Sequence, residues 1–172
     1  MPDLPQVRVL TPADAPAYRE VRLTALRTDP LAFSTTAAEF EMRPLEEVVA
    51  RLAPGPVSVT FGAFLAGKLV GLLTVAREER PALTHRANVF GVSVLPAERG
   101  QGCGDALLRA GLAQVRSWKG VTSLHLGVME TQGAALSLYG RHGFQLWGTQ
   151  PDALRINGRP VAEHHLWLAL TP

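Results

Sequence analysis

The feature that most constrains the fold is a glycine-rich link between an apolar strand and an amphipathic helix. It lies in the stretch VSVLPAERGQGCGDALLRAGL, residues 92–112, where β-branched residues and a proline precede three glycines on alternate positions. The helix that follows places Leu108, Leu112 and Val115 on one face. Free N–H groups at the start of a helix attract anions, and glycines let a ligand approach the backbone closely. The link is therefore either an anion-binding site or an ordinary tight turn, and its glycines alone do not decide between them.

Three phosphate-binding patterns compete for this link. A P-loop needs a glycine–lysine pair followed by serine or threonine, but the Gly67–Lys68 pair is followed by leucine. A dinucleotide fingerprint needs a third glycine at the position of Asp105, and an acid there would repel a pyrophosphate. The pattern [QR]-x-x-G-x-[GA] is met by Arg99, Gly102 and Gly104. The last pattern is the one that the chain fits in full.

The order of the expected elements gives the fold class. We expect an α/β fold in one domain over residues 1–172, with a mixed sheet of about seven strands and helices on both faces. The central strand–helix–strand unit should be parallel and right-handed. Expected strands are 6–10, 57–65, 68–76, 85–95, 121–129, 144–150 and 164–170. Expected helices begin at Pro12 or nearer Asp14, at Pro44, after Gly104 and, with Thr131 as N-cap, at 131–143, giving the order β-α-α-β-β-β-α-β-α-β-β.

Composition narrows the class of partner and compartment. There is no run of eighteen apolar residues and no visible signal peptide, so we expect neither a membrane span nor export. Cys103 is the one cysteine, which makes a reducing cytoplasm the simplest location. The formal net charge is only +2 and no block of like charge occurs, so nucleic acid is not an expected partner. No histidine–cysteine spacing suggests a metal, and a homodimer through the last strands is plausible.

Two blocks together resemble the GCN5-related N-acetyltransferase (GNAT) superfamily. VSVLPAERGQGCGDALL matches the signature V-x-P-x-x-[RQ]-G-x-G-x-[GA] before a helix, and TQGAALSLYGRHGF is similar to N-x-x-A-x-x-L-Y-x-x-x-G-F. Gln132 stands where that family usually has asparagine. The expected element order also matches this fold, so the resemblance covers essentially the whole chain.

The resemblance implies an acetyl-CoA site on the glycine link. Val92, Ser93 and Val94 would lie along the pantetheine arm, and Gln132 would contribute from the second block. The thioester would enter a gap where 88–94 and 121–129 separate. The pyrophosphate would sit on the loop formed by Arg99, Gly100, Gln101, Gly102, Cys103, Gly104 and Asp105. We expect the Cys103 side chain to be a small buried group and not a nucleophile.

The implied reaction is direct attack of a primary amine on the thioester in a ternary complex. Tyr139 occupies the position that the family uses as the general acid for the thiolate, although its spacing alone predicts a core aromatic. The base is open. Relatives that acetylate ribosomal-protein N-termini often carry a glutamate where this chain has Gly127. Glu39, Glu41 and Glu130 are the candidates that remain, together with His85 and water.

Two functions follow from these features. The first is an acetyl-CoA-dependent N-acetyltransferase acting on an amine of a small molecule or peptide. The alternative is a non-catalytic module of the same fold that binds or senses acyl-CoA. Tyr139 in register with an intact glycine loop favours the enzyme, whereas Gln132 in place of asparagine slightly favours the module. A nicotinamide-dependent enzyme is disfavoured by Asp105.

Overall fold

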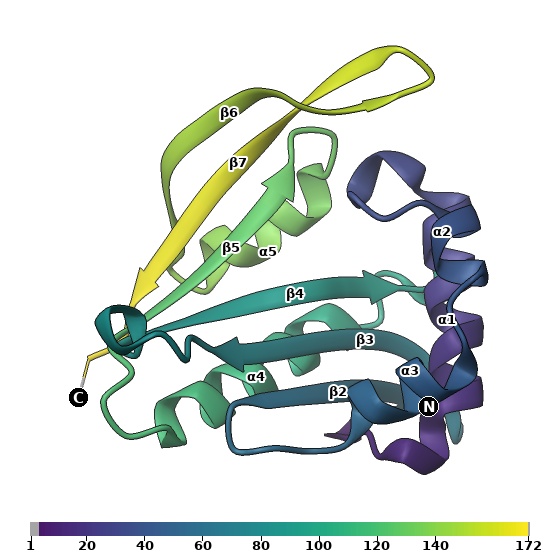
Figure 1. The fold of residues 1–172 in the computed structure, drawn as a ribbon, viewed down its shortest axis with the longest axis horizontal. Coiled ribbons are helices and arrows are strands. Elements are labelled where there is room, and N and C mark those ends of the chain that lie inside the picture. The colour runs from purple at the N-terminus through teal and green to yellow at the C-terminus, as the bar shows by residue number, and fades with distance from the viewer. Residues whose placement is uncertain (1–3, 172) are drawn as a thin grey trace.

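A computed structural model describes residues 4–171 of the chain as a twisted seven-stranded sheet flanked by helices (Figure 1). The strand order is β1-β2-β3-β4-β5-β7-β6, with β4 and β5 parallel and every other neighbouring pair antiparallel. The mixed sheet of seven strands expected from the sequence is confirmed. The strands are β1 Gln6–Val9, β2 Ser58–Leu65, β3 Lys68–Arg77, β4 Arg86–Val94, β5 Ser123–Met129, β6 Gln145–Ile156 and β7 Arg159–Ala169.

Helices cover both faces of the sheet. On β3, Leu69 and Leu72 pack with α1 and α3, whereas Val70 and Leu73 point the opposite way and pack against α4. Residues three positions apart share a face here because the β2–β3 pairing shifts register between Ala63 and Phe64, which adds one residue to β3. β3 thus lies at the centre of two apolar cores. The helices are α1 Ala15–Thr28, α2 Ala37–Glu41, α3 Leu45–Leu52, α4 Cys103–Ser117 and α5 Gly133–Arg141. No helix within the described residues is long and apolar enough to cross a membrane.

The two parallel strands in the middle of the sheet separate along their length. Pairing between β4 and β5 runs only from Arg86 to Asn88 on β4 and from Ser123 to His125 on β5. Beyond this point the strands diverge, and α1 and α2 lie across the open side of the split (Figure 1). The separation expected between 88–94 and 121–129 is therefore confirmed, and it leaves one edge of β4 without a strand partner.

The start and end of several elements differ from expectation. The first helix starts near Asp14, after a 3-10 turn at Pro12–Asp14, because Pro16 is tolerated only in its first turn. The short helix α2 lies in a stretch expected to be a connection. Thr36 and Glu39 hydrogen-bond each other's backbone there, which gives five residues a capped helix. The N-cap of α5 is Gln132 and not Thr131, so that expectation was wrong by one residue.

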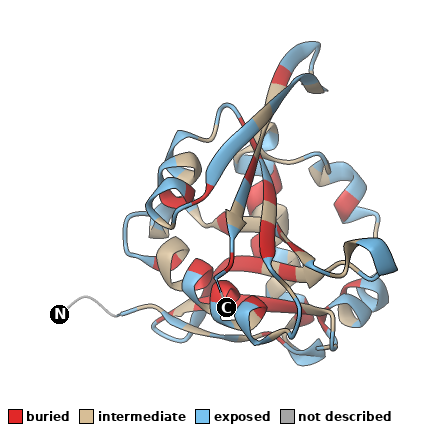
Figure 2. Ribbon diagram, turned by 90° about the vertical axis from the view of Figure 1, so that its left-hand side faces the viewer, coloured by how far each residue is buried: buried red, intermediate tan, exposed pale blue. Residues whose placement is uncertain are grey.

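The C-terminal hairpin is longer than the apolar pattern predicted. Both β6 and β7 continue to the turn at Asn157–Gly158, where both residues have positive φ. This distal part is mostly exposed, while buried residues concentrate where helices cover the sheet (Figure 2). A strand that is solvated on both faces has no apolar alternation, so residues 151–156 and 159–163 gave no strand signal.

Candidate functional site

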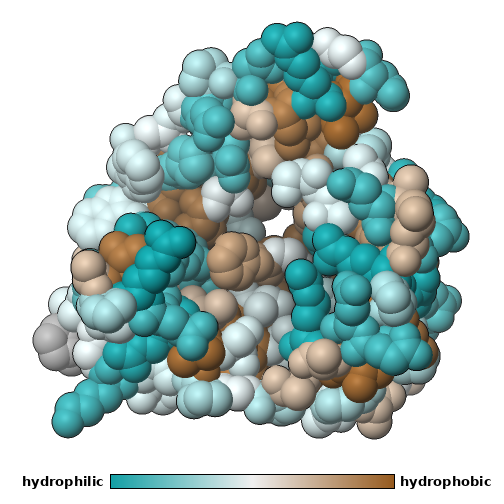
Figure 3. Space-filling view, viewed as in Figure 1, coloured by the Kyte–Doolittle hydropathy of each residue, from teal (hydrophilic) through white to brown (hydrophobic). Residues whose placement is uncertain are grey.

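The split between β4 and β5 opens into a cavity of about 990 Å³. Its wall is formed by α1 and the loop after it, β4, the glycine loop, β5, α5 and the C-terminal hairpin. The space-filling view shows the molecule hollowed between the lower part of the sheet and the part that carries β5 to β7 (Figure 3). The cavity therefore brings together the two sequence blocks that the resemblance singled out.

The glycine loop presents free backbone amides to this cavity. Gly100 and Gly102 have φ of 79° and 82°, and Gly102 is the N-cap of α4. Such values strain any residue that has a Cβ. Among residues 4–171, no backbone or side-chain acceptor takes a hydrogen bond from the amides of 100–105. A helix start with unused N–H groups and positive partial charge is suited to a phosphate-type anion.

Gly104 serves a different purpose from its two neighbours. A Cβ at this position would lie 3.2 Å from Cδ2 of Leu138, so the absence of a side chain lets α4 start close to α5. Asp105 accepts hydrogen bonds from His142 at 2.7 Å and Arg109 at 2.6 Å. The His142 bond, more than the Arg109 bond, holds the pKa of Asp105 below its ordinary value. The Asp105 carboxylate is thus bonded to two side chains and, within the described chain, does not accept a hydrogen bond from the loop amides.

The other loop residues hold the loop in place. The Arg99 side chain donates to the Val94 carbonyl at 3.1 Å, which ties the loop to the end of β4. The Gln101 side chain donates to Glu98 at 2.8 Å and does not line the cavity. Cys103 is buried, and burial raises the pKa of its thiol. A buried thiol with a raised pKa is a weak nucleophile, as the sequence suggested.

β4 offers an open edge to the same cavity. Its other edge is paired with β3, where Ser93 lies opposite Leu72 and Val94 lies opposite Gly71. The register of this pairing shifts around Gly91, whose φ is 58°. Val92, Ser93 and Val94 all line the cavity. An extended ligand could add to this edge as a further strand.

Tyr139 lies on the cavity wall within the apolar core of α5. It is 4% exposed and packs edge to face on Phe144, with ring centroids 5.7 Å apart. Its hydroxyl makes no hydrogen bond to another described residue, and burial raises the pKa of Tyr139 well above its ordinary value. The hydroxyl therefore stays protonated at neutral pH and is free to donate to a ligand. Gln132 lies nearby and donates to Asp29 at 3.3 Å.

The carboxylates expected as base candidates lie elsewhere. Glu39 caps α2, Glu41 forms an ion pair with Arg27 at 2.9 Å, and Glu130 accepts from the Ala162 amide at 3.0 Å. None of these glutamates lines the cavity, and neither does His85. The structure thus gives each of the three glutamates a local partner outside the site.

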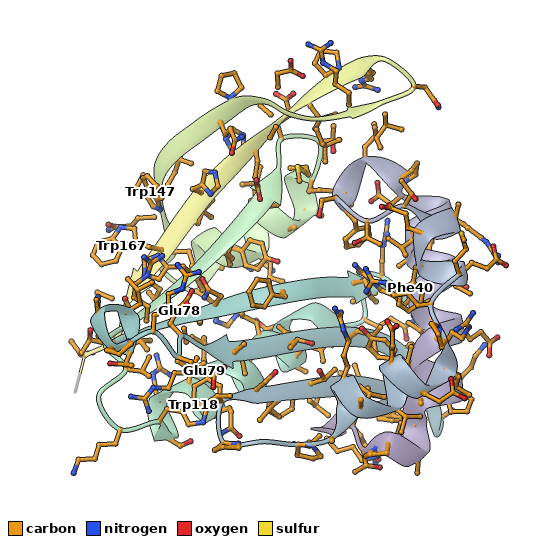
Figure 4. The ribbon with its side chains drawn as sticks, viewed as in Figure 1. Phe40, Glu78, Glu79, Trp118, Trp147 and Trp167 are labelled. Atoms are coloured by element: carbon orange, nitrogen blue, oxygen red, sulfur yellow. The ribbon has the colours of Figure 1, made fainter. Side chains whose placement is uncertain are left out.

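Charged side chains that the sequence did not single out line the cavity instead. Arg22 projects from α1, and Glu163 and His165 project from β7. Trp147 of β6, which Figure 4 labels, packs on His165 with 5.5 Å between ring centroids. The sequence did not indicate Arg22 or Glu163 as part of a site. Arg22 lies in a helix whose polar residues are expected to face solvent, and Glu163 lies in the polar part of the hairpin. A signal was nevertheless present, because Gly127 interrupts an apolar strand without a turn. No cluster that could hold a metal ion occurs in the described part of the chain.

Comparison with protein families and curated proteins gives a consistent result. The model described as "Acetyltransferase (GNAT) family" matches residues 23–144. A mycothiol acetyltransferase from Salinispora tropica is 32% identical over 152 residues, covering 86% of this chain and 47% of that protein. An L-amino acid N-acetyltransferase from Escherichia coli is 29% identical over 116 residues, covering 67% of this chain and 71% of that protein. The chain thus spans about half the length of the mycothiol acetyltransferase it matches.

Comparison with solved structures gives the same fold. A putative acetyltransferase from Salmonella typhimurium, solved with its cofactor acetyl-CoA, superposes with a TM-score of 0.82 at 20% identity. The match covers 98% of this chain and 95% of that one. At this identity the likeness establishes the fold alone.

Proposed function

This chain belongs to the acetyltransferase (GNAT) family, and from that premise we propose that it transfers the acetyl group of acetyl-CoA to a primary amine. The observation that carries the proposal is the single cavity that joins an unused helix start, the open edge of β4 and the Tyr139 hydroxyl. The pyrophosphate of acetyl-CoA requires an anion-binding site, its pantetheine arm requires an extended edge to bond to, and the leaving thiolate requires a proton donor.

Acetyl-CoA would bind along the β4 side of the cavity. The amides of 100–105 would hold its pyrophosphate, because all of these residues except Gln101 line the cavity and no described residue accepts a hydrogen bond from their N–H groups. The open edge at 92–94 would bond the pantetheine arm, with Gln132 close to it across the split. The acetyl-CoA complex of the Salmonella protein with the same fold supports this choice of cosubstrate.

The amine would attack the thioester directly within a ternary complex. The C–N bond forms, the C–S bond breaks, and the thiolate leaves toward Tyr139. A free thiol has a pKa near 8.5, so a donor beside the sulfur stabilises the leaving group at neutral pH. Burial raises the pKa of Tyr139 above that of the thiol, so the hydroxyl holds its proton at neutral pH and donates a hydrogen bond to the forming thiolate. Proton transfer to sulfur is completed as the attacking nitrogen loses its own proton, which returns through solvent to the phenolate.

Thiol release from acetyl-CoA over a panel of amines tests this function. Tyr139→Phe should lower kcat by about 10- to 100-fold while the Kd for acetyl-CoA stays within about twofold, since the ring still packs on Phe144. Tyr18→Phe is the matched control, because Tyr18 packs on Phe40 of α2 outside the cavity. Equal kcat for Tyr139→Phe and wild type would contradict the assignment of the general acid.

A non-catalytic acyl-CoA-binding module is the second candidate, and Gln132 in place of asparagine is the observation that favours it. In this case the protein would bind acetyl-CoA in the same cavity. No amine would then accelerate thiol release, and Tyr139→Phe would change nothing. The named relatives act on different acceptors, so they leave the identity of the amine open.

A further inference from the structure

Arg22 is a half-buried cation whose Nη1 atom lacks a hydrogen-bond partner among the described residues. Its Nη1 atom is buried and has no hydrogen-bond partner among residues 4–171, and no carboxylate of the described residues forms an ion pair with it. Its guanidinium lies over the Phe33 ring, 4.4 Å from the centroid, and lines the cavity. Burying a charged N–H group without an acceptor is unfavourable, so the position is suited to a ligand that supplies one.

The surroundings of Arg22 are positive. Burial lowers the pKa of this guanidinium; Tyr18 acts in the opposite direction, and the charges of Arg43 and Arg51 lower the pKa further. An anion would relieve both the desolvation and the repulsion between these cations. Arg86 also has a buried, unpartnered Nε, but it lies at the closed end of the split, where β4 still pairs with β5.

Arg22 faces the open part of the split from the β4 side. A Cβ at Gly91 would lie 3.8 Å from Arg22 Nη1. Gly91 lies three residues beyond Asn88, the last residue of β4 that pairs with β5. The guanidinium therefore stands just past the point where the two strands separate.

Glu163 faces the same part of the split from the β5 side. A Cβ at Gly127 would overlap the Glu163 carboxylate, so this side chain from β7 fills the place above Gly127. Gly127 lies two residues beyond His125, the last residue of β5 that pairs with β4. Arg22, on the β4 side, and Glu163, on the β5 side, thus both face the split two to three residues beyond the last paired residues of the two strands.

Glu163 differs from the other carboxylates on the cavity wall. Asp29 is bonded to Gln132, Glu98 to Gln101, and Asp105 to His142 and Arg109; these residues and Glu163 are the acids that line the cavity. Within the described chain the Glu163 carboxylate accepts no hydrogen bond, and His165 Nε2 lies 4.0 Å from its Oε2. It is the lining carboxylate that remains available to a ligand.

We propose that the acceptor is an amine that carries its own carboxylate, of the amino acid type, with Arg22 binding the carboxylate and Glu163 binding the ammonium group. The inference rests on the proposed function. Glu163 takes one proton from the ammonium group, and the neutral amine nitrogen then forms the bond to the acetyl carbonyl carbon. The C–S bond breaks, and the departing thiolate receives its proton from Tyr139. The nitrogen loses its second proton to solvent as the amide forms, and solvent returns a proton to the Tyr139 phenolate. The positive charge of Arg22 on the β4 side and the negative charge of Glu163 on the β5 side are complementary to the carboxylate and the ammonium group of such a molecule.

Matched acceptors test the carboxylate. L-amino acids, their primary amides and their decarboxylated amines differ only in the group that would face Arg22. With the wild-type protein, kcat/KM for the acids should exceed kcat/KM for the amides by about 10- to 100-fold, the range for one charge-assisted contact. Equal kcat/KM for acids and amides would overturn the inference and leave the proposed function intact.

Variants of Arg22 identify the residue that discriminates. Arg22→Met should reduce the acid-to-amide ratio to about one, and Arg22→Lys should keep part of the preference because it retains the charge but loses the planar fork. Arg27→Met is the control: Arg27 lies on the same helix as Arg22, but it pairs with Glu41 at 2.9 Å and does not line the cavity. Thermal unfolding of each variant separates a lost contact from a lost fold. An unchanged ratio in a folded Arg22→Met protein would overturn the assignment.

Transfer of the carboxylate between strands tests Glu163. Glu163→Gln should lower kcat/KM by about 10- to 100-fold and shift the acidic limb of its pH profile. Gly127→Glu alone should be damaging because its side chain overlaps Glu163. Gly127→Glu combined with Glu163→Gly should restore part of the activity, since a carboxylate returns to the same place. If Glu163→Gln changed neither kcat/KM nor its pH profile, Glu163 would be excluded as the group that binds and deprotonates the ammonium group.

Calorimetry decides the carboxylate site if no amine is acetylated. That result would refute the proposed function, whereas binding is measured without turnover. An L-amino acid titrated into the protein saturated with CoA should bind wild type and Arg27→Met, and bind Arg22→Met at least tenfold more weakly. Equal binding to all three proteins, or to none, would overturn the inference independently of catalysis.

Discussion

Replacing Gly102 by glutamate perturbs the proposed pyrophosphate seat with little steric effect. Gly102 is the N-cap of α4 and lines the cavity, and nothing lies within 4 Å of the place where its Cβ would be. The new side chain therefore has room, but it brings a carboxylate to the same amides that would bind the cosubstrate. The change tests the anion site itself.

Two separate costs follow from the structure. The φ of 82° strains a residue with a Cβ by about 1–2 kcal/mol, which lowers the free energy of unfolding. A carboxylate about 5 Å from one phosphate charge raises the free energy of binding by about 0.8 kcal/mol at the dielectric constant of water and by about 3 kcal/mol at an effective value of 20. A pyrophosphate carries more than one charge, so the Kd for acetyl-CoA should rise by at least about tenfold.

Gly158→Glu separates these two costs. Gly158 has φ of 77° and open space around its Cβ, but it lies in the hairpin turn away from the cavity. Both variants should lose similar stability in thermal unfolding. In isothermal titration calorimetry, Gly102→Glu alone should weaken acetyl-CoA binding. An unchanged Kd for Gly102→Glu, or an equal loss in Gly158→Glu, would refute the reasoning.

Two further predictions concern stability. Leu107 is fully buried between α4 and the sheet, so Leu107→Ala should lower the free energy of unfolding by about 3 kcal/mol in urea denaturation, whereas exposed Leu4→Ala should change it by less than about 0.5 kcal/mol. The hydrogen bonds from Arg8 lower the pKa of Asp14 from 3.8 to about 2, so this pair stabilises the fold above pH 4 and loses its effect as pH falls toward 2. Because Arg8 is half exposed, the wild type should exceed Asp14→Asn by only about 1 kcal/mol at pH 7, and a difference that does not shrink at low pH would contradict the assignment.

The sheet and the conformation of the glycine loop were predictable because their signals are local. Ala66–Gly67 between two apolar strands indicated the β2–β3 hairpin, and both residues have the positive φ that its turn requires. The glycine link needed only its own residues and the helix after it. Gly100 and Gly102 are required because their φ angles are positive, and Gly104 is required because a side chain there would crowd Leu138. Each requirement concerns a single position, so the glycine itself indicates it in the sequence.

The acceptor side was not predictable, because its residues meet only through the tertiary fold. Arg22 and Glu163 lie 141 positions apart by their numbers, on a helix and on the last strand, and each resembles a solvated charge in its own segment. The glutamates that were expected as bases, such as Glu39, were chosen from a polar connection that instead forms a capped helix. Gly127 held the one available clue, since its missing side chain makes room for a carboxylate from the neighbouring strand.

A crystal structure of the protein with acetyl-CoA and an L-amino acid amide or acid would test the central claim most directly. The account predicts the pyrophosphate on the amides of 100–105, the pantetheine arm along 92–94, and the thioester sulfur within hydrogen-bond reach of the Tyr139 hydroxyl. Density for the cosubstrate outside the split between β4 and β5, or a sulfur on the far side of the cavity from Tyr139, would contradict it.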